Sequence, residues 1–316
     1  MMAAAGARST SRATSTALLV AWGTTLLLSR LPEIVLREAF GWDVPWINIV
    51  WIVVAAGLTV AASLVPLMRP LRAYFVVMLT VLVLTTVVDP LIRGALFGDI
   101  APAGTDPQLR RLFAERILLV VEALAIIPVL AALGYRGGEA YVALGKLRAP
   151  SGLRIGRQAL SWAVVGPIVA ILLVAATAAF AGSLARPTPD LWSRALPLLP
   201  IAWLAAAFNA FAEEVLYRAG PLGPLARVVG PKAGPWILAV WFGLGHVYGG
   251  IPSGLTGFVM AGLLGLLFGK AMIDTRGLGV PWALHFSADA AIYTFLAVAA
   301  VAGTHCMVII ARLLGP

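Results

Sequence analysis

Runs of about twenty mostly apolar residues recur along this chain, and they restrict it to folds that a lipid bilayer can hold. Of the 316 residues, 61% are hydrophobic and only 12% are charged. Soluble domains average roughly a quarter charged residues. The sequence therefore predicts an all-α, polytopic integral membrane protein.

A transmembrane helix needs ~20 predominantly apolar residues, and by that rule we expect nine spans, with eight or ten also possible. The nine runs cover residues 15–31, 46–66, 72–88, 117–134, 159–181, 195–217, 233–249, 252–272 and 280–302. The first run follows Arg8 and Arg12 but ends without a small-x-small cleavage site. It is therefore expected to be an uncleaved first transmembrane helix.

The net charge of +9 comes from Lys and Arg in short loops between the apolar runs. This pattern suits membrane topology and anionic lipid head groups, not nucleic acid. Alternate loops differ in Lys and Arg content, which predicts a cytoplasmic N-terminus, an outer C-terminus and a multi-pass protein of the cell membrane. The single cysteine, Cys306, excludes an internal disulfide and a cysteine-based zinc site.

A stretch rich in glycine and basic residues, Gly134–Gln158, divides the chain into two parts. We expect residues 1–150 to form N-terminal transmembrane helices of unassigned role. Residues 151–316 carry all the candidate chemistry.

Three short patterns place ionisable groups on apolar segments, where such groups are expensive and rarely lack a function. These patterns are Glu213-Glu214-x-x-x-Arg218, Phe242-x-x-x-His246 and His285-x-x-x-Asp289. Each histidine has a potential supporting residue on its own helix face, four positions away. A carboxylate and histidines around one water suit peptide-bond hydrolysis.

Helix geometry separates the two glutamates. Glu214 and Arg218 lie four residues apart and share a face, so they are expected to form an ion pair. Glu213 points about 100° away and is free to face other helices. A single membrane histidine often only bonds a backbone carbonyl, so the functional interpretation depends on the three patterns together.

In this order and spacing, the three patterns resemble the motifs of the CPBP family of intramembrane proteases. That family comprises the type II CAAX prenyl endopeptidases and bacterial relatives also called Abi proteins, and it is often labelled a metalloprotease family. The similarity covers roughly residues 200–290. It implies an intramembrane endopeptidase that acts on a membrane-embedded peptide or protein, with an active site toward the cytoplasmic side.

The resemblance also implies roles for the residues. Glu213 would be the general base for the attacking water, His246 would help to bind that water, and His285 with Asp289 would stabilise the oxyanion. Glu214 and Arg218 would hold the site together, with Phe242 supporting His246.

Asp289 leaves alternatives open, because the best-known CAAX endopeptidases resemble Asn at this position. An ionised carboxylate only accepts hydrogen bonds, so Asp289 could instead orient His285. His246, His285, Glu213 and Asp289 could also ligate a metal, since histidine and carboxylate suit zinc. The cofactor is unknown from sequence, and we favour a glutamate-activated water without an obligatory metal.

A non-enzymatic alternative is a membrane immunity factor or a proton-coupled carrier, in which Glu213 and the histidines relay protons or bind a partner. The chain shows no convincing internal repeat of the kind that many carriers have. The paired histidine patterns and the missing repeat favour the protease.

Overall fold

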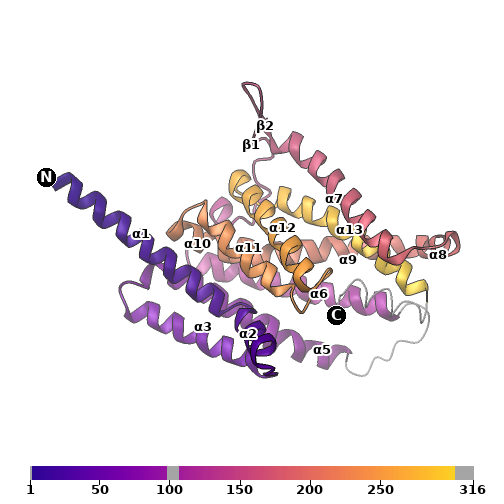
Figure 1. Ribbon diagram of the computed structural model, residues 1–316, viewed down its shortest axis with the longest axis horizontal. Helices are drawn as coiled ribbons and strands as arrows, with labels where there is room; N and C mark the ends of the chain where they lie inside the picture. The colour runs from indigo at the N-terminus through magenta and orange to yellow at the C-terminus, as the bar shows by residue number, and fades with distance from the viewer. Residues whose placement is uncertain (1, 98–106, 303–316) are drawn as a thin grey trace.

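The computed structural model describes residues 2–97 and 107–302, almost all of which form helices or short connections. Figure 1 shows the helices packed into one body, with α1 projecting at one side and a hairpin at the top. Cys306 lies outside the described residues. The prediction of an all-α membrane protein is confirmed.

The N-terminal part is a bundle of helices that is broken at two places. Its first span bends by 56° between residues 27 and 31, and a π-helical turn interrupts its fourth helix. The elements are α1 (Met2–Leu27), α2 (Leu31–Phe40), α3 (Ile47–Leu64), η1 (Arg69–Leu71), α4 (Arg72–Val83), η2 (Leu84–Val88), α5 (Asp89–Phe97) and α6 (Pro107–Ala132).

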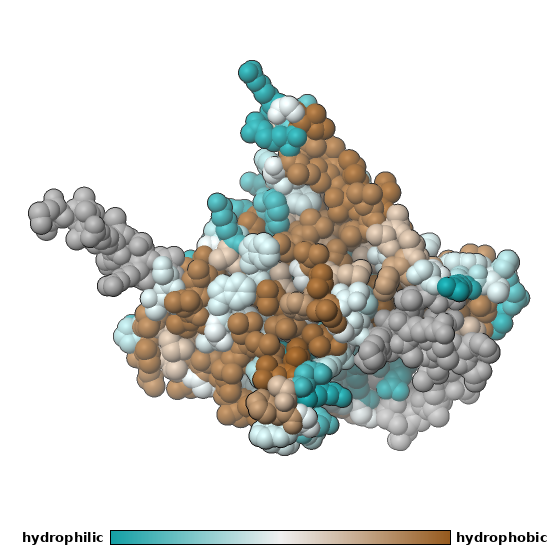
Figure 2. Space-filling model, viewed as in Figure 1, coloured by the Kyte–Doolittle hydropathy of each residue, from teal (hydrophilic) through white to brown (hydrophobic). Residues whose placement is uncertain are grey.

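The segment between the two parts contains a short turn, η3 (Gly137–Glu139), and an antiparallel hairpin that the sequence did not predict. Its strands are β1 (Pro150–Ile155) and β2 (Gln158–Ser161). The hairpin leads directly into α7 (Trp162–Ala185), whose apolar surface is largely exposed, as Figure 2 shows. Such an exposed apolar helix is expected where lipid, not water, is the solvent.

The remaining helices build the C-terminal part, in which α9 lies centrally. Helix α13 packs against both α7 and α9, and α12 packs against α11. These elements are α8 (Pro189–Ala195), η4 (Leu196–Leu198), α9 (Leu199–Glu214), η5 (Val215–Ala219), α10 (Gly220–Val229), α11 (Ala233–Gly245), α12 (Gly254–Thr275) and α13 (Gly279–Val301).

The small residues Ala261, Gly265 and Gly269 bring α12 close to α11. A Cβ built on Gly265 would lie 3.3 Å from the backbone of Ala239 on α11, and one on Gly269 would lie 3.1 Å from Pro235. Spacing of four residues places these small side chains on one face, so the two helices can approach closely.

The structure does not confirm nine spans. Among the described residues, six helical segments are long and apolar enough to cross a membrane, or seven if the bent α1–α2 pair counts as one span. Helix α11 has only 13 residues. The last 18 residues of helix α6, from 115 to 132, include the charged residues Glu115, Arg116 and Glu122. These two predicted spans therefore lack either the length or the apolar composition.

The largest hydrophobic cluster joins the two parts of the chain. It combines side chains of α1, α3, α4 and α6 with those of η5, α10 and α11. The turn η5 follows the Glu213–Glu214 pair directly, so the N-terminal helices pack against the element that carries the candidate chemistry.

The loop that leads into α13 depends on a close backbone contact. A Cβ on Gly277 would lie 2.4 Å from the Cα of Gly145 and 2.5 Å from the carbonyl oxygen of Ala143. We expect Gly277→Ala to destabilise the fold by ~1–3 kcal/mol, because this backbone cannot yield as a flexible side chain would. Gly57→Ala is the matched control, since a Cβ there meets nothing within 4 Å.

Thermal unfolding in detergent micelles gives the melting temperatures of both variants and of the native protein. Equal melting temperatures for Gly277→Ala and the native protein would contradict this packing.

Candidate active site

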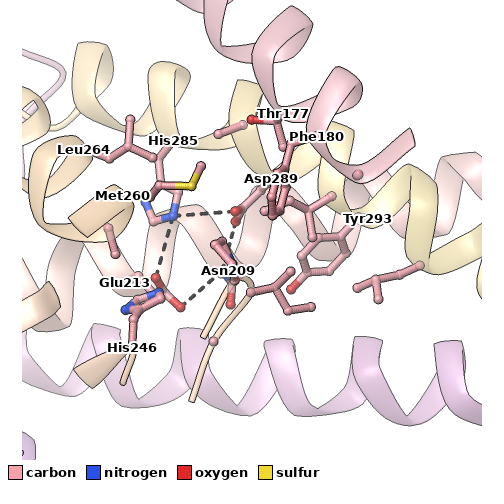
Figure 3. A pocket seen from close by; sticks show the side chains of 18 of the residues that line it. Thr177, Phe180, Asn209, Glu213, His246, Met260, Leu264, His285, Asp289 and Tyr293 are labelled. Atoms are coloured by element: carbon pink, nitrogen blue, oxygen red, sulfur yellow. Dashed lines mark hydrogen bonds and ion pairs between the residues drawn. The ribbon is translucent and has the colours of Figure 1, made fainter. Parts of the chain in front are cut away.

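Two helix faces supply most of the polar side chains of the site. Helix α9 carries Asn209 and Glu213 four residues apart, and α13 carries His285 and Asp289 at the same spacing. Residues four apart share a helix face, so both pairs point into the space between α9 and α13. Figure 3 shows them converging there.

Asn209 links the two helices. Its Nδ2 atom donates to Asp289 Oδ2 at 2.9 Å and to Glu213 Oε1 at 3.3 Å. The amide therefore fixes the carboxylates of two candidate catalytic residues at once. The sequence analysis missed Asn209, although its position one turn before Glu213 was a usable signal.

His285 lies among three carboxylates. Its Nδ1 atom is 2.8 Å from Glu214 Oε1. Its Nε2 atom is 3.6 Å from Glu213 Oε2 and 3.7 Å from Asp289 Oδ1. Ionised carboxylates only accept hydrogen bonds, so the protonated ring, which has a donor on each nitrogen, satisfies this environment best.

The ion pair expected from the spacing of Glu214 and Arg218 is present and buried. Their side chains are 0% and 2% exposed, and Arg218 Nη1 donates to the Glu214 Oε1 atom that also faces His285. Aromatic rings cover the guanidinium, with the Phe242 centroid at 4.3 Å and the Phe268 centroid at 5.1 Å. Such stacking stabilises a desolvated arginine.

Phe268 was also missed by the sequence analysis. Its ring stacks on His285 with centroids 5.2 Å apart, so one aromatic side chain packs against both Arg218 and His285. Nothing in the local sequence distinguishes it from the other apolar residues of α12.

A π-helical turn follows the glutamate pair directly. It spans Val215–Ala219 and contains Arg218. Single π turns inside α-helices are rare and occur frequently at functional sites. The wider turn rotates the residues of α10 about the helix axis relative to those of α9. Regular helix spacing in the sequence could not reveal this rotation.

His246 is the C-cap residue of the short helix α11 and follows its last residue, Gly245. Its Nδ1 atom is 3.1 Å from the carbonyl oxygen of Phe242, and the two rings pack with centroids 4.7 Å apart. Because a carbonyl oxygen only accepts, we assign the hydrogen to Nδ1. In the neutral ring this assignment leaves Nε2 as an acceptor for a water molecule.

Two cavities meet at Glu213 and His246. The larger, of about 380 Å³, lies among α6, α7, α9, α12 and α13 and is lined mostly by apolar side chains. The smaller, of about 280 Å³, is lined partly by the bend between α1 and α2 and by α3, α4 and η2. Its walls include Ser29, Arg30, Asn48, Thr85 and Thr86.

The side chains do not form a zinc site in this arrangement. Zinc takes three or four protein ligands at ~2.0–2.3 Å. Within residues 2–97 and 107–302, no group of three or more His, Cys, Asp or Glu side chains could hold a metal ion. His285 faces carboxylates with both nitrogens, and His246 faces a carbonyl with one.

The three sequence patterns therefore come together at the meeting point of the cavities. Glu213, His246, His285, Asp289 and Phe242 line the larger cavity. Glu214 and Arg218 lie behind it, buried and paired with each other.

Comparison with known proteins bears on this part of the chain. Residues 195–291 match the model of the family described as Type II CAAX prenyl endopeptidase Rce1-like. No curated protein and no solved structure matches the chain. The matched segment holds all three patterns, so the resemblance found in the sequence is confirmed for residues 195–291.

Arg218→Ala should lower both stability and activity, because it leaves the buried Glu214 carboxylate without its partner. Breaking a buried ion pair costs ~3–5 kcal/mol. Arg111→Ala provides the control, because this arginine is 71% exposed and its pair with Glu115 should contribute less than ~1 kcal/mol. Thermal melting compares the two variants. Native-like melting of an inactive Arg218→Ala protein would make Arg218 a participant in the reaction itself.

Proposed function

We propose that this protein is an intramembrane endopeptidase in which Glu213 activates a water molecule to hydrolyse a peptide bond of a membrane-associated peptide or protein. The proposal rests mainly on one observation. Glu213 borders both cavities, is 22% exposed and forms no ion pair with an arginine of the described residues, whereas its neighbour Glu214 is fully buried and ion-paired. A general base needs access to water and an unblocked carboxylate.

The reaction follows from the donors and acceptors around Glu213. Its carboxylate takes a proton from water, and the resulting hydroxide attacks the carbonyl carbon of the substrate. The C–N bond then breaks as Glu213 returns the proton to the leaving amine. His246 Nε2, an acceptor in our assignment, holds the second hydrogen of the water and so fixes its orientation.

His285 is suited to stabilise the oxyanion of the tetrahedral intermediate. Its Nε2–H points toward Glu213 and Asp289 at 3.6–3.7 Å, which is too long for strong hydrogen bonds. This donor is therefore available to a substrate oxygen. Glu214 holds the ring through Nδ1 at 2.8 Å, and preorganised donors of this kind supply a large part of catalysis in acyl transfer.

The N-terminal helices gain a role from the smaller cavity. Side chains from the bend between α1 and α2, from α3 and from η2 give it hydroxyl, amide and guanidinium groups, and it reaches Glu213 and His246. We assign to it the supply of water to the catalytic centre. The larger, mostly apolar cavity then accommodates the substrate.

The orientation remains a prediction from the loop charges. In that arrangement the N-terminus and the active site face the cytoplasm, and the membrane surrounds the apolar helices. The family match supports a membrane-associated substrate without identifying it.

Glu213→Gln should abolish proteolysis while leaving the melting temperature close to that of the native protein. The amide keeps the size of the side chain but cannot accept a proton at neutral pH. The rate of cleavage should therefore fall by about 10²-fold or more, as expected for a lost general base. Comparative membrane proteomics of cells with native or Glu213→Gln protein measures the new protein termini.

Glu139→Gln serves as the matched control, because Glu139 is an exposed acid that pairs with Arg227 on the surface. New termini should appear with the native protein and with this control, and should be absent with Glu213→Gln. The same termini in the Glu213→Gln cells would remove Glu213 from the mechanism. Their absence from all cells would favour a non-enzymatic function.

Asp289→Asn should retain cleavage. The asparagine carbonyl can still accept from Asn209, while its NH₂ group adds a donor on the side of His285 and the cavity. Asp289→Ala loses both contacts and should be strongly impaired. Rate measurements on purified variants, beside metal analysis of the native protein, test this. An inactive Asp289→Asn would make Asp289 the group that orients His285, and stoichiometric zinc in the native protein would overturn the metal-independent mechanism.

A further inference from the structure

An arginine lies in the larger cavity, outside the segment that the family match covers. Arg116 projects from α6, and its Nε atom donates to the hydroxyl of Tyr293 on α13 at 2.7 Å. Both side chains line the cavity beside Leu112, Ile292 and Leu296. The family match covers residues 195–291, so Arg116 and Tyr293 both lie outside it. Neither residue is part of the three sequence patterns.

Arg116 has no carboxylate partner among the described residues. Its neighbour Glu115 pairs with Arg93 at 3.0 Å and with Arg111 at 3.1 Å. The oxygens of Glu213 and Asp289 face Asn209 and His285. Within the described residues, a neutral phenol is thus the single hydrogen-bond partner of a guanidinium that has five N–H donors.

An unpaired cation in an apolar cavity is costly, and such groups in membrane proteins usually mark a substrate or ion pathway. The guanidinium fork matches a carboxylate, which it binds with two parallel hydrogen bonds. We propose that Arg116 and Tyr293 form a subsite that binds a carboxylate of the substrate. This inference deepens the proposed protease function and depends on it only for the identity of the ligand as a substrate.

The position of this subsite relates it to the hydrolytic centre. Tyr293 lies two turns beyond His285 on the same face of α13, which corresponds to roughly 12 Å along the helix. An extended peptide advances ~3.3 Å per residue, so a substrate that passes from His285 to this subsite covers the distance with about three or four residues. The carboxylate can come from a chain terminus or from an acidic side chain.

A different role is compatible with the same contacts. Arg116 lies within electrostatic range of both Glu213 and Asp289, so a second role is that of a counter-charge to these two carboxylates. Such a role predicts equal effects on substrates with and without a carboxylate. The two roles are therefore separable by binding measurements.

The experiment uses three fluorescein-labelled apolar hexapeptides and the full-length protein in nanodiscs. One peptide ends in a free carboxylate, one has the same sequence with a C-terminal amide, and one is amidated with Glu as its last residue. Fluorescence anisotropy measures binding to the Glu213→Gln variant, which cannot hydrolyse the probes under the proposed mechanism.

The free-acid peptide should bind at least ~10-fold more tightly than its amide, a difference within the usual range for a charged hydrogen bond. In the Glu213→Gln background, Arg116→Gln should abolish this preference, Tyr293→Phe should reduce it, and Arg111→Gln should leave it unchanged. Tyr293→Phe removes one hydroxyl, so it keeps the test valid if Arg116→Gln fails to fold. Tight binding of the Glu-ended amide would assign the subsite to an acidic side chain, and weak binding would assign it to the chain terminus.

Equal binding of the acid and both amides, or a preference that survives Arg116→Gln, would overturn the subsite. A preference that depends on Arg116, in a protein that generates no new termini, would uphold the subsite and reject the protease. If new termini appear and Arg116→Gln weakens the binding of acid and amide peptides equally, the protease is upheld and the subsite is rejected.

Discussion

The buried contact of Glu214 with both Arg218 and His285 is the interaction on which the rest of the site depends. One carboxylate oxygen accepts from the guanidinium and from His285 Nδ1, and thereby joins α9, η5 and α13 at a single point. Charges without water require such mutual satisfaction, because an unpaired buried charge costs several kcal/mol. With Nδ1 held, the other nitrogen of His285 points toward Glu213 and the cavity. The ion pair thus controls the geometry of a residue that does not touch Arg218 itself.

The sequence predicted those parts of the site that follow from helix periodicity. Spacing of four residues correctly indicated the Glu214–Arg218 pair and the shared face of His285 and Asp289. It did not indicate Asn209 or Phe268, because an isolated amide or phenylalanine in an apolar helix has many ordinary explanations. The π turn at 215–219 escaped prediction since it depends on tertiary packing and not on a residue pattern. Two of the nine predicted spans are not confirmed in the described part of the chain: α11 is apolar but short, and α6 is long but carries charges.

The two cavities give a reason for the N-terminal helices to pack against the segment that resembles the Rce1-like family. Glu213 and His246 form their shared boundary, with polar groups from the α1–α2 bend, α3 and η2 on one side and a mostly apolar space on the other. Hydrolysis inside a membrane must bring water and an apolar substrate to the same atom. We infer that the bundle serves the first requirement and α6, α7, α12 and α13 serve the second. The hydrophobic cluster that includes side chains of both parts holds the helices around the two cavities in fixed positions.

The central claim is that Glu213 activates water and does not itself attack the peptide bond. Hydrolysis of a substrate identified from its new terminus, carried out in ¹⁸O-labelled water with purified protein over several turnovers, tests this claim most directly. Mass spectrometry should find one ¹⁸O atom in each new carboxylate and none in the side chain of Glu213. Label in the Glu213 carboxylate would contradict the account, because it would require a covalent acyl intermediate on that residue.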